Sequence, residues 1–160
     1  EITYGDWSSD VCSSDLHDSY GELAKTGLRF LASHQDEATT RKRLESGQAF
    51  VATHADQIIA TITLYPPNPQ SRCELYRQAD VYCLGQLAVD QNWQQQGLGR
   101  RMIDRVLQQA RENGAKAVAL DTAEGALQLR RWYERLGFEF VQYVSWDVTN
   151  YRSIVMLKQL

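Results

Sequence analysis

The sequence predicts one α/β domain in which helices flank a mixed central sheet, the arrangement of an α+β sandwich. Three observations indicate this fold class. A strand, a helix and a second strand follow one another between residues 81 and 120, a pair of β-rich segments precedes them, and a helix with two closing strands comes after. The length of 160 residues fits a single domain, which we place at residues 17–160.

Residues 1–16 are set apart from this domain. The segment from Asp6 to Leu16 resembles the translation of a common sequencing-library adapter, and Glu1 and Ile2 fit the adapter's outer arm. The segment is polar and has no hydrophobic periodicity, so we treat residues 1–16 as non-native and expect the native N-terminus to be missing. Without its four acidic residues, the formal net charge changes from −3 to +1.

Composition excludes several classes of protein. Neither the net charge of −3 nor that of +1 indicates a basic surface that would bind a polyanion, and the basic residues are scattered along the sequence. We therefore expect no nucleic-acid partner. No apolar run approaches the roughly 20 residues that span a bilayer, and no leader with a cleavage site opens the chain. Cys12, Cys73 and Cys83 form no CxxC pair, which suggests neither a disulfide framework nor a zinc site. We therefore expect a cytoplasmic protein without a metal or a membrane partner.

The first elements of the domain are two amphipathic helices and a hairpin. Apolar residues recur among polar ones between residues 18 and 46, which predicts two helices broken near Ser33–His34. Segments 48–54 and 57–65 are rich in β-branched and apolar residues, and the two residues between them predict a tight turn. Prolines end the second strand, and the polar stretch that follows to Asp80 predicts a long loop.

The central unit is a strand, a helix and a strand. Residues 81–89 carry apolar side chains on both faces, which indicates a strand at the centre of the sheet. A helix is predicted from Gly99 to Asn113–Gly114, and residues 117–120 predict a short buried strand. Because a helix connects these two strands, we expect them to lie parallel.

The C-terminal elements are a helix and a pair of strands. Apolar residues at helical spacing predict a helix from about Glu124, and Gly137 is a plausible stop. Segments 138–146 and 153–158 then predict closing strands.

The most informative motif is the loop from Gln94 to Arg100. Its two glycines let backbone approach a ligand, and the helix that follows places unpaired N–H groups at its start, where phosphate binds well. A dinucleotide-binding loop would need a third glycine where Met102 stands, and a turn directly after the strand. A P-loop would need Gly-Lys-Ser/Thr, which is absent from the sequence here. The alternative without a ligand is that the two glycines only allow the chain to turn between the strand and the helix.

Two motifs in order resemble the GCN5-related N-acetyltransferase (GNAT) superfamily. Leu87-Ala88-Val89-Asp90, followed by Gln94-x-x-Gly97-x-Gly99-Arg100, resembles the family's acetyl-CoA motif, which is Arg/Gln-x-x-Gly-x-Gly/Ala after a strand. The segment from Arg131 to Phe138, Arg-Trp-Tyr-Glu-Arg-Leu-Gly-Phe, resembles the family's Tyr-Glu-Lys-Leu-Gly-Phe segment. The resemblance covers residues 18–160. It implies the GNAT acyl-CoA N-acyltransferase fold with its first strand missing, replaced by the adapter-like residues.

This resemblance implies an N-acetyltransferase domain. The enzyme would transfer an acetyl group from acetyl-CoA to a primary amine of a small molecule or peptide by direct attack, and it would need no metal. The alternative is a catalytically weak acyl-CoA-binding sensor of the same fold, which Ala126 motivates, because the family often has a cofactor-contacting asparagine there. Relatives are often dimers, so a homodimer is open.

The resemblance also implies roles for single residues. Strand backbone would pair with the pantetheine arm and loop amides would cradle the pyrophosphate of the cofactor, through Leu87, Ala88, Val89, Gln94, Gln95, Gln96, Gly97, Leu98, Gly99 and Arg100.

Tyr133 would protonate the departing CoA thiolate, although its spacing alone would make it a core aromatic. The base that deprotonates the amine stays open between Asp121, Glu124 and a water chain. Gln86 on the central strand cannot accept a proton at neutral pH.

Overall fold

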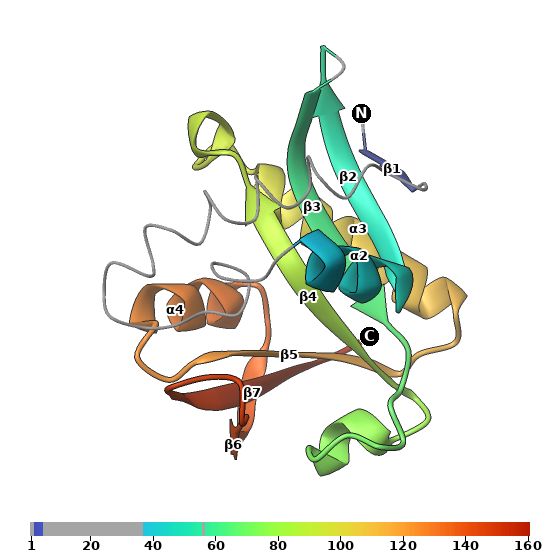
Figure 1. The fold of residues 1–160 in the computed structure, drawn as a ribbon, viewed down its shortest axis with the longest axis vertical. Coiled ribbons are helices and arrows are strands. Elements are labelled where there is room, and N and C mark those ends of the chain that lie inside the picture. Colours follow the sequence, from blue (N-terminus) through green and yellow to red (C-terminus); the bar gives the residue numbers. More distant parts are fainter. Residues whose placement is uncertain (1, 5–36, 56) are drawn as a thin grey trace.

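The computed structural model describes residues 2–4, 37–55 and 57–160. In this part of the chain seven strands form one sheet in the order β1-β2-β3-β4-β5-β7-β6, and α3 connects the parallel pair β4 and β5 (Figure 1). All other neighbouring strands are antiparallel. The mixed sheet with flanking helices confirms the predicted fold class. The elements are β1 Ile2–Tyr4, α2 Glu37–Glu45, β2 Gln48–His54, β3 Gln57–Tyr65, the 3-10 helix η2 Glu74–Arg77, β4 Val81–Val89, the 3-10 helix η3 Gln91–Trp93, α3 Leu98–Glu112, β5 Ala117–Ala123, α4 Leu127–Arg135, β6 Glu139–Ser145 and β7 Arg152–Gln159.

The sheet edge beside β2 is occupied by residues of the adapter-like segment, which the sequence predicts to stand in place of the family's first strand. The three residues of β1 fill this edge and pair antiparallel with β2, with Thr3 opposite Val51. The edge of β2 offers a row of backbone N–H and C=O groups, and any segment that can extend is able to pair with it. Whether residues 1–16 are non-native stays a prediction. Of the two helices predicted between residues 18 and 46, α2 is the second, and the first lies outside the described residues.

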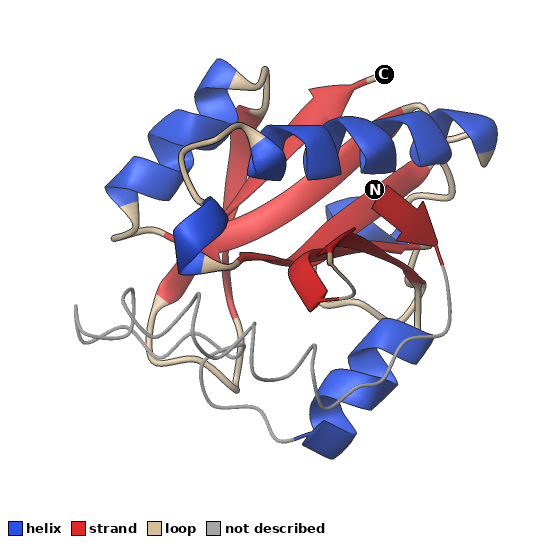
Figure 2. Cartoon of the chain, turned by 90° about the horizontal axis from the view of Figure 1, so that it is seen from above, coloured by secondary structure: helices blue, strands red, loops and turns tan. Residues whose placement is uncertain are grey.

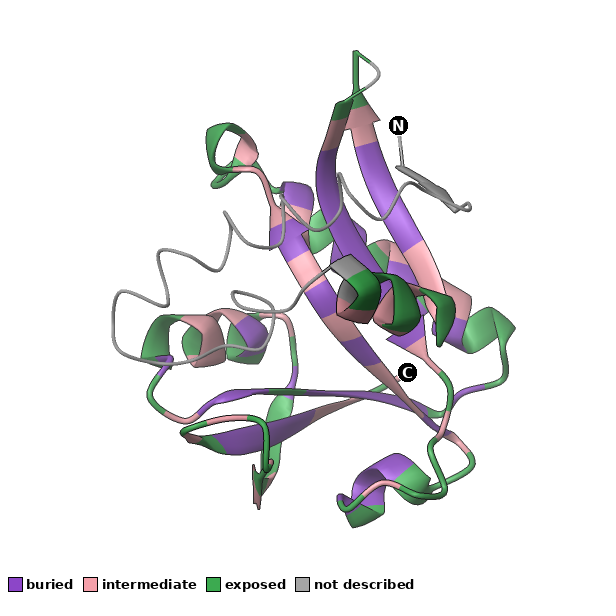
Figure 3. Cartoon of the chain, viewed as in Figure 1, coloured by how far each residue is buried: buried purple, intermediate pink, exposed green. Residues whose placement is uncertain are grey.

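The main core lies between the sheet and one layer of helices. Helices α3 and α4 cover one side of the sheet, and α2 lies on the other (Figure 2). Met102, Ile103 and Val106 on the inner side of α3 are fully buried against strand residues such as Ile62 and Leu120. Their spacing of three and four residues places them on one stripe of the helix. The strands that meet this stripe are the most buried segments in Figure 3.

Strand β4 separates from β5 after the first third of its length. The two strands pair only through Val81–Cys83 and Ala117–Ala119, so beyond Cys83 the remainder of β4 keeps β3 as its neighbour. One edge of the β4 backbone thereby faces the space that opens between the strands.

A bulge interrupts β4 in the same region. Thr61 of β3 lies opposite Ala88, but Thr63 lies opposite Gly85, so Gln86 and Leu87 together face one residue of β3. Gln86 has a φ of 53°, and its carbonyl accepts a hydrogen bond of 2.9 Å from the Thr61 hydroxyl. Bulges of this kind re-aim side chains and are common next to functional sites. The bulge also breaks the strict alternation of faces that the sequence predicts for residues 81–89.

Two predicted boundaries shift in the structure. Strand β5 continues to Ala123, and α4 begins at Leu127, because the backbone N–H of Glu124 donates to the carbonyl of Arg152 and a turn follows. The long loop before β4 contains η2, whose Leu75 and Tyr76 are buried against the second face of the sheet. In residues 37–55 and 57–160, no helix is long and apolar enough to cross a membrane.

Candidate active site

Side-chain hydrogen bonds shape the loop that connects β4 to α3. Asp90 accepts from the backbone N–H of Asn92 at 2.8 Å, and Gln94 donates to the carbonyl of Val89 at 3.0 Å. Gln96 donates to the carbonyl of Asn92 at 2.9 Å. Two of the predicted cofactor residues, Gln94 and Gln96, therefore hold the loop in shape with their side chains, which leaves contacts with a ligand to the backbone.

The start of α3 presents backbone N–H groups. The N–H of Arg101 makes the first helical bond, to Gly97, so those of Leu98, Gly99 and Arg100 precede the helical ladder. Gly97 has a φ of 80°, and a Cβ there would meet nothing within 4 Å, so the space above it is open. The first turn of α3 contains no acidic residue. This helix start therefore suits an anion such as a phosphate group.

The two sequence motifs meet at Gly99. A Cβ on this glycine would lie 3.4 Å from the ring of Trp132 in α4 and 3.7 Å from the Val89 side chain at the end of β4. The rings of Trp132 and Tyr133 are 5.0 Å apart. A Cβ at these distances would be in ordinary van der Waals contact, so the loop of the first motif packs directly against α4, the helix that carries Tyr133.

The second motif caps helix α4. Gly137, with a φ of 85°, donates to the carbonyl of Glu134 at 3.0 Å, and Phe138 donates to the carbonyl of Tyr133 at 3.1 Å. These two bonds are those of a Schellman cap, which is completed by the edge-to-face contact of the Phe138 and Tyr133 rings at 5.9 Å. The Leu-Gly-Phe part of the motif therefore fixes the end of α4 and the position of the Tyr133 ring.

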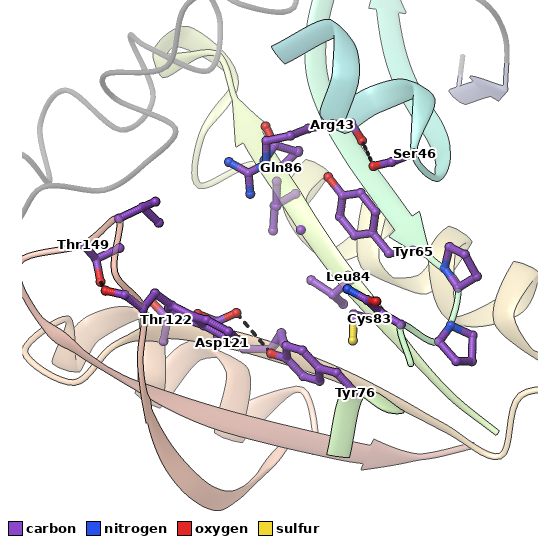
Figure 4. Close-up of a pocket in the computed structure, with 18 of the residues that line it drawn as sticks. Arg43, Ser46, Tyr65, Tyr76, Cys83, Leu84, Gln86, Asp121, Thr122 and Thr149 are labelled. Atoms are coloured by element: carbon purple, nitrogen blue, oxygen red, sulfur yellow. Dashed lines mark hydrogen bonds between the residues drawn. The ribbon is translucent and has the colours of Figure 1, made fainter. Parts of the chain in front are cut away.

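A cavity of about 600 Å³ lies where β4 and β5 separate (Figure 4). Its wall includes Leu84 to Leu87 of β4, Leu120 to Thr122 of β5, and Tyr133 of α4. Leu87 and Tyr133, predicted from different motifs, thus face one space. The loop residues 94–100 do not line this cavity, and Ala88 is buried within β4. The predicted site therefore has two parts, an anion site at α3 and a cavity at the fork of the sheet.

Asp121 of β5 is the acidic side chain in this cavity. One of its carboxylate oxygens accepts from the Tyr76 hydroxyl at 3.1 Å, and the other accepts from the Trp146 indole N–H at 2.9 Å. Burial, and next the charge of Asp121, raise the pKa of Tyr76 well above its ordinary value, so Tyr76 remains a donor at neutral pH. The sequence does not identify Tyr76 or Trp146 as site residues, because neither residue lies in a recognisable motif.

Glu124, the other acidic candidate for the base, is engaged elsewhere. Its two oxygens accept from the Arg152 guanidinium at 2.7 and 2.9 Å, and these bonds lower the pKa of Glu124. A base near neutral pH needs a shift in the other direction. Of the two carboxylates that the sequence proposes, only Asp121 faces the cavity.

The chain belongs to the acetyltransferase (GNAT) family, whose model matches residues 14–138. A relative of Bacillus subtilis (strain 168), S-(2-succino)cysteine N-acetyltransferase, is 28% identical over 125 residues, which cover 75% of this chain and 72% of the relative. The resemblance found in the sequence is thereby confirmed, and the protein is an acetyl-CoA-dependent acetyltransferase.

Solved structures of the family share the fold. A GNAT family acetyltransferase from Elizabethkingia anophelis with acetyl-CoA bound has a TM-score of 0.71 at 15% identity, over 100% of this chain and 97% of that chain. The ribosomal-protein-alanine N-acetyltransferase from Brucella melitensis has a TM-score of 0.72 at 18% identity, over 100% of this chain and 99% of that chain.

The site fits acetyl-CoA as a substrate. The β4 backbone edge beyond Cys83 can pair with an amide-bearing arm, and the amides at the start of α3 suit a pyrophosphate. For a metal the described segments offer no cluster of three or more His, Cys, Asp or Glu side chains.

Proposed function

We propose that this protein acetylates a primary amine of a small molecule or peptide, and that the amine attacks the thioester directly. The observation that carries the proposal is the cavity at the fork of the sheet, where Asp121, Leu87 and Tyr133 line one space. Two acid–base groups around the exposed edge of a strand are what a direct transfer requires. The name of the Bacillus subtilis relative, an N-acetyltransferase of a cysteine derivative, supports a small amine acceptor.

The donor would be held by the residues predicted from the first motif. Backbone groups of Leu87, Ala88 and Val89 would pair with the pantetheine arm, because the β5 side of β4 is open there. The amides from Gln95 to Arg100 would bind the pyrophosphate, with the Arg100 guanidinium adding positive charge. Gln94 and Gln96 would contribute mainly by holding the loop in shape.

The chain's own side chains would move the protons. Asp121 would take a proton from the acceptor ammonium and pass it to solvent, which leaves a neutral amine as the nucleophile. As the new carbon–nitrogen bond forms and the carbon–sulfur bond breaks, Tyr133 would give its phenolic proton to the leaving thiolate. Tyr133 regains a proton from the nitrogen, so one proton reaches solvent and one ends on the thiol.

The proposal is tested by the release of free CoA thiol with a panel of amines. Tyr133→Phe keeps the ring that packs on Phe138 and removes only the hydroxyl, so we expect kcat to fall about 100-fold with thermal stability retained. Tyr143→Phe, at an exposed tyrosine of β6, is the matched control. Full turnover by Tyr133→Phe at saturating substrate would refute the acid role.

A second pair of variants tests Asp121. Asp121→Asn keeps the shape of the side chain but cannot accept the ammonium proton, whereas Glu124→Gln removes a carboxylate outside the cavity. We expect a large loss of turnover only in the first variant.

The sensor alternative predicts a different result. If calorimetry shows tight binding of acetyl-CoA but no amine in a broad panel releases the thiol, the chain binds its ligand without transfer. The presence of Asp121 in the cavity favours transfer over this alternative. A cytoplasmic location and a homodimeric state stay predictions.

A further inference from the structure

The cavity at the fork carries opposite charges on two facing walls. Among its described lining residues, Asp121 on β5 is the one acidic side chain and Arg43 on α2 is the one basic side chain. Figure 4 shows Asp121 beside Tyr76 on one side and Arg43 with Tyr65 and Gln86 on the other. The lining between them is neutral. The acidic and the basic side chain therefore border the space in which the acceptor must bind from opposite sides.

The Asp121 wall suits an ammonium group. Both carboxylate oxygens are oriented by neutral donors, so the negative charge is fixed in place but not neutralised by Tyr76 and Trp146. No Lys, Arg or His of the described chain lies within 4 Å of this carboxylate. The rings of Tyr76 and Trp146 stack at 6.2 Å beside it. Aromatic faces next to a carboxylate attract a cation further.

The Arg43 wall suits a carboxylate. A guanidinium keeps its charge at any working pH and presents planar donors that match the two oxygens of a carboxylate. Arg43 lies close enough to Tyr65 for its charge to counteract the rise that burial causes in the Tyr65 pKa. The carbonyl of Arg43 also accepts from the Ser46 hydroxyl at 2.9 Å, which fixes the end of α2 above the cavity.

The volume restricts the size of the acceptor. The space of about 600 Å³ has to admit the thioester end of the donor as well as the acceptor amine. A ligand that reaches both charged walls within this space is a small molecule. A simple amine would leave the Arg43 wall unused, and the C-terminal carboxylate of a long peptide would lie too far from its reacting amine.

We propose that the acceptor is a small, amino-acid-like molecule whose ammonium group binds at Asp121 and whose carboxylate binds at Arg43. This proposal rests on the proposed function, because it assigns the acceptor side of the same site. It makes Arg43 a residue that determines specificity, because the carboxylate that Arg43 would bind takes no part in the transfer.

The experiment compares free amino acids with their amides, which keep the amine and lose only the carboxylate charge. For the unmodified protein we expect kcat/KM for the free acid to exceed that for the amide by about tenfold or more, the size of one charge-assisted hydrogen bond. In Arg43→Gln this preference should disappear through a higher KM for the acid, with kcat retained. Arg43→Lys should keep part of the preference, and Lys42→Gln, on the exposed side of α2, should keep all of it.

The outcomes separate the two proposals. Thiol release with amines but no preference for the free acid, or a preference that Arg43→Gln leaves intact, overturns the two-point acceptor while the acetyl transfer stands. Absence of thiol release with every amine overturns the proposed function instead. In that case calorimetry with free acids and amides, in the presence of CoA, still decides the inference. Binding of the acid that depends on Arg43 supports it, and absence of such binding overturns it.

Discussion

The cap of α4 allows a quantitative test, because the chain contains a matched glycine at the end of α3. Gly137 and Gly114 have φ values of 85° and 82°, and each closes the same pair of capping hydrogen bonds. An alanine at either position must adopt the left-handed conformation, which costs about 1 kcal/mol. They differ in their surroundings: a Cβ at Gly114 meets nothing within 4 Å, whereas a Cβ at Gly137 would lie 2.5 Å from the Lys158 ammonium nitrogen.

Gly137→Ala should therefore cost more than Gly114→Ala. Lys158 is flexible and can move away, but it then gives up its hydrogen bond of 2.8 Å to the Leu136 carbonyl, which is worth about 1 kcal/mol. We expect the free energy of unfolding to fall by about 1 kcal/mol in Gly114→Ala and by about 2 kcal/mol in Gly137→Ala. Because the cap positions Tyr133, only Gly137→Ala should also lower kcat.

Urea unfolding measures both costs. In a Lys158→Met background the side chain ends one atom earlier, so the cost of Gly137→Ala should drop to that of Gly114→Ala. Equal losses in the two single variants would show that Lys158 contributes nothing. Losses below about 0.3 kcal/mol in both would refute the argument from backbone conformation.

Three further predictions concern the site and its frame. Gly99→Val should weaken CoA binding in calorimetry and lower stability by about 1–3 kcal/mol, because its added methyl groups meet Trp132, whereas Gly99→Ala should be milder. Thr61→Val should lower stability by about 1–2 kcal/mol in urea unfolding and raise the KM for acetyl-CoA, since the buried carbonyl of Gln86 loses its donor. The raised pKa of Tyr76 stabilises the fold below pH about 10, the ordinary pKa of tyrosine, and this contribution is lost as the pH rises through the higher folded value. We therefore expect the free energy of unfolding to fall less between pH 8 and a pH above 10 in Tyr76→Phe than in the unmodified chain, as measured by unfolding curves at both pH values.

The sequence predicts the parts of this fold that depend on local pattern. The hairpin of β2 and β3, the helix after Gly97 and the parallel pair β4 and β5 each carry their own periodicity or turn residues, and the structure confirms them. The bulge in β4 could not be predicted, because its cause is the pairing with Thr61, twenty-five residues away. The same holds for β1, which takes its place by pairing with a distant strand.

The residues of the candidate site also fall into two groups, those that a local motif identifies and those that only the folded chain brings together. Tyr133 and the loop from Gln94 to Arg100 belong to contiguous motifs, so the sequence singles them out. Tyr76, Trp146 and Arg43 come from three separate segments, and only the folded chain brings them around one cavity. The sequence does not distinguish Asp121 from Glu124 as a candidate base. The structure does, because Glu124 accepts hydrogen bonds from Arg152.

The two motifs also turn out to be one physical unit. In the first motif, Gly99 has no side chain and lies beside the ring of Trp132. In the second motif, Gly137 turns the chain so that Phe138 packs on Tyr133. The two glycines lie against the same helix, Gly99 beside its Trp132 and Gly137 at its end. The loop that suits the donor phosphates and the phenol proposed to protonate its sulfur are therefore fixed relative to each other by packing. Packing thus places a helix start that suits a phosphate next to the helix whose Tyr133 we propose as the proton donor.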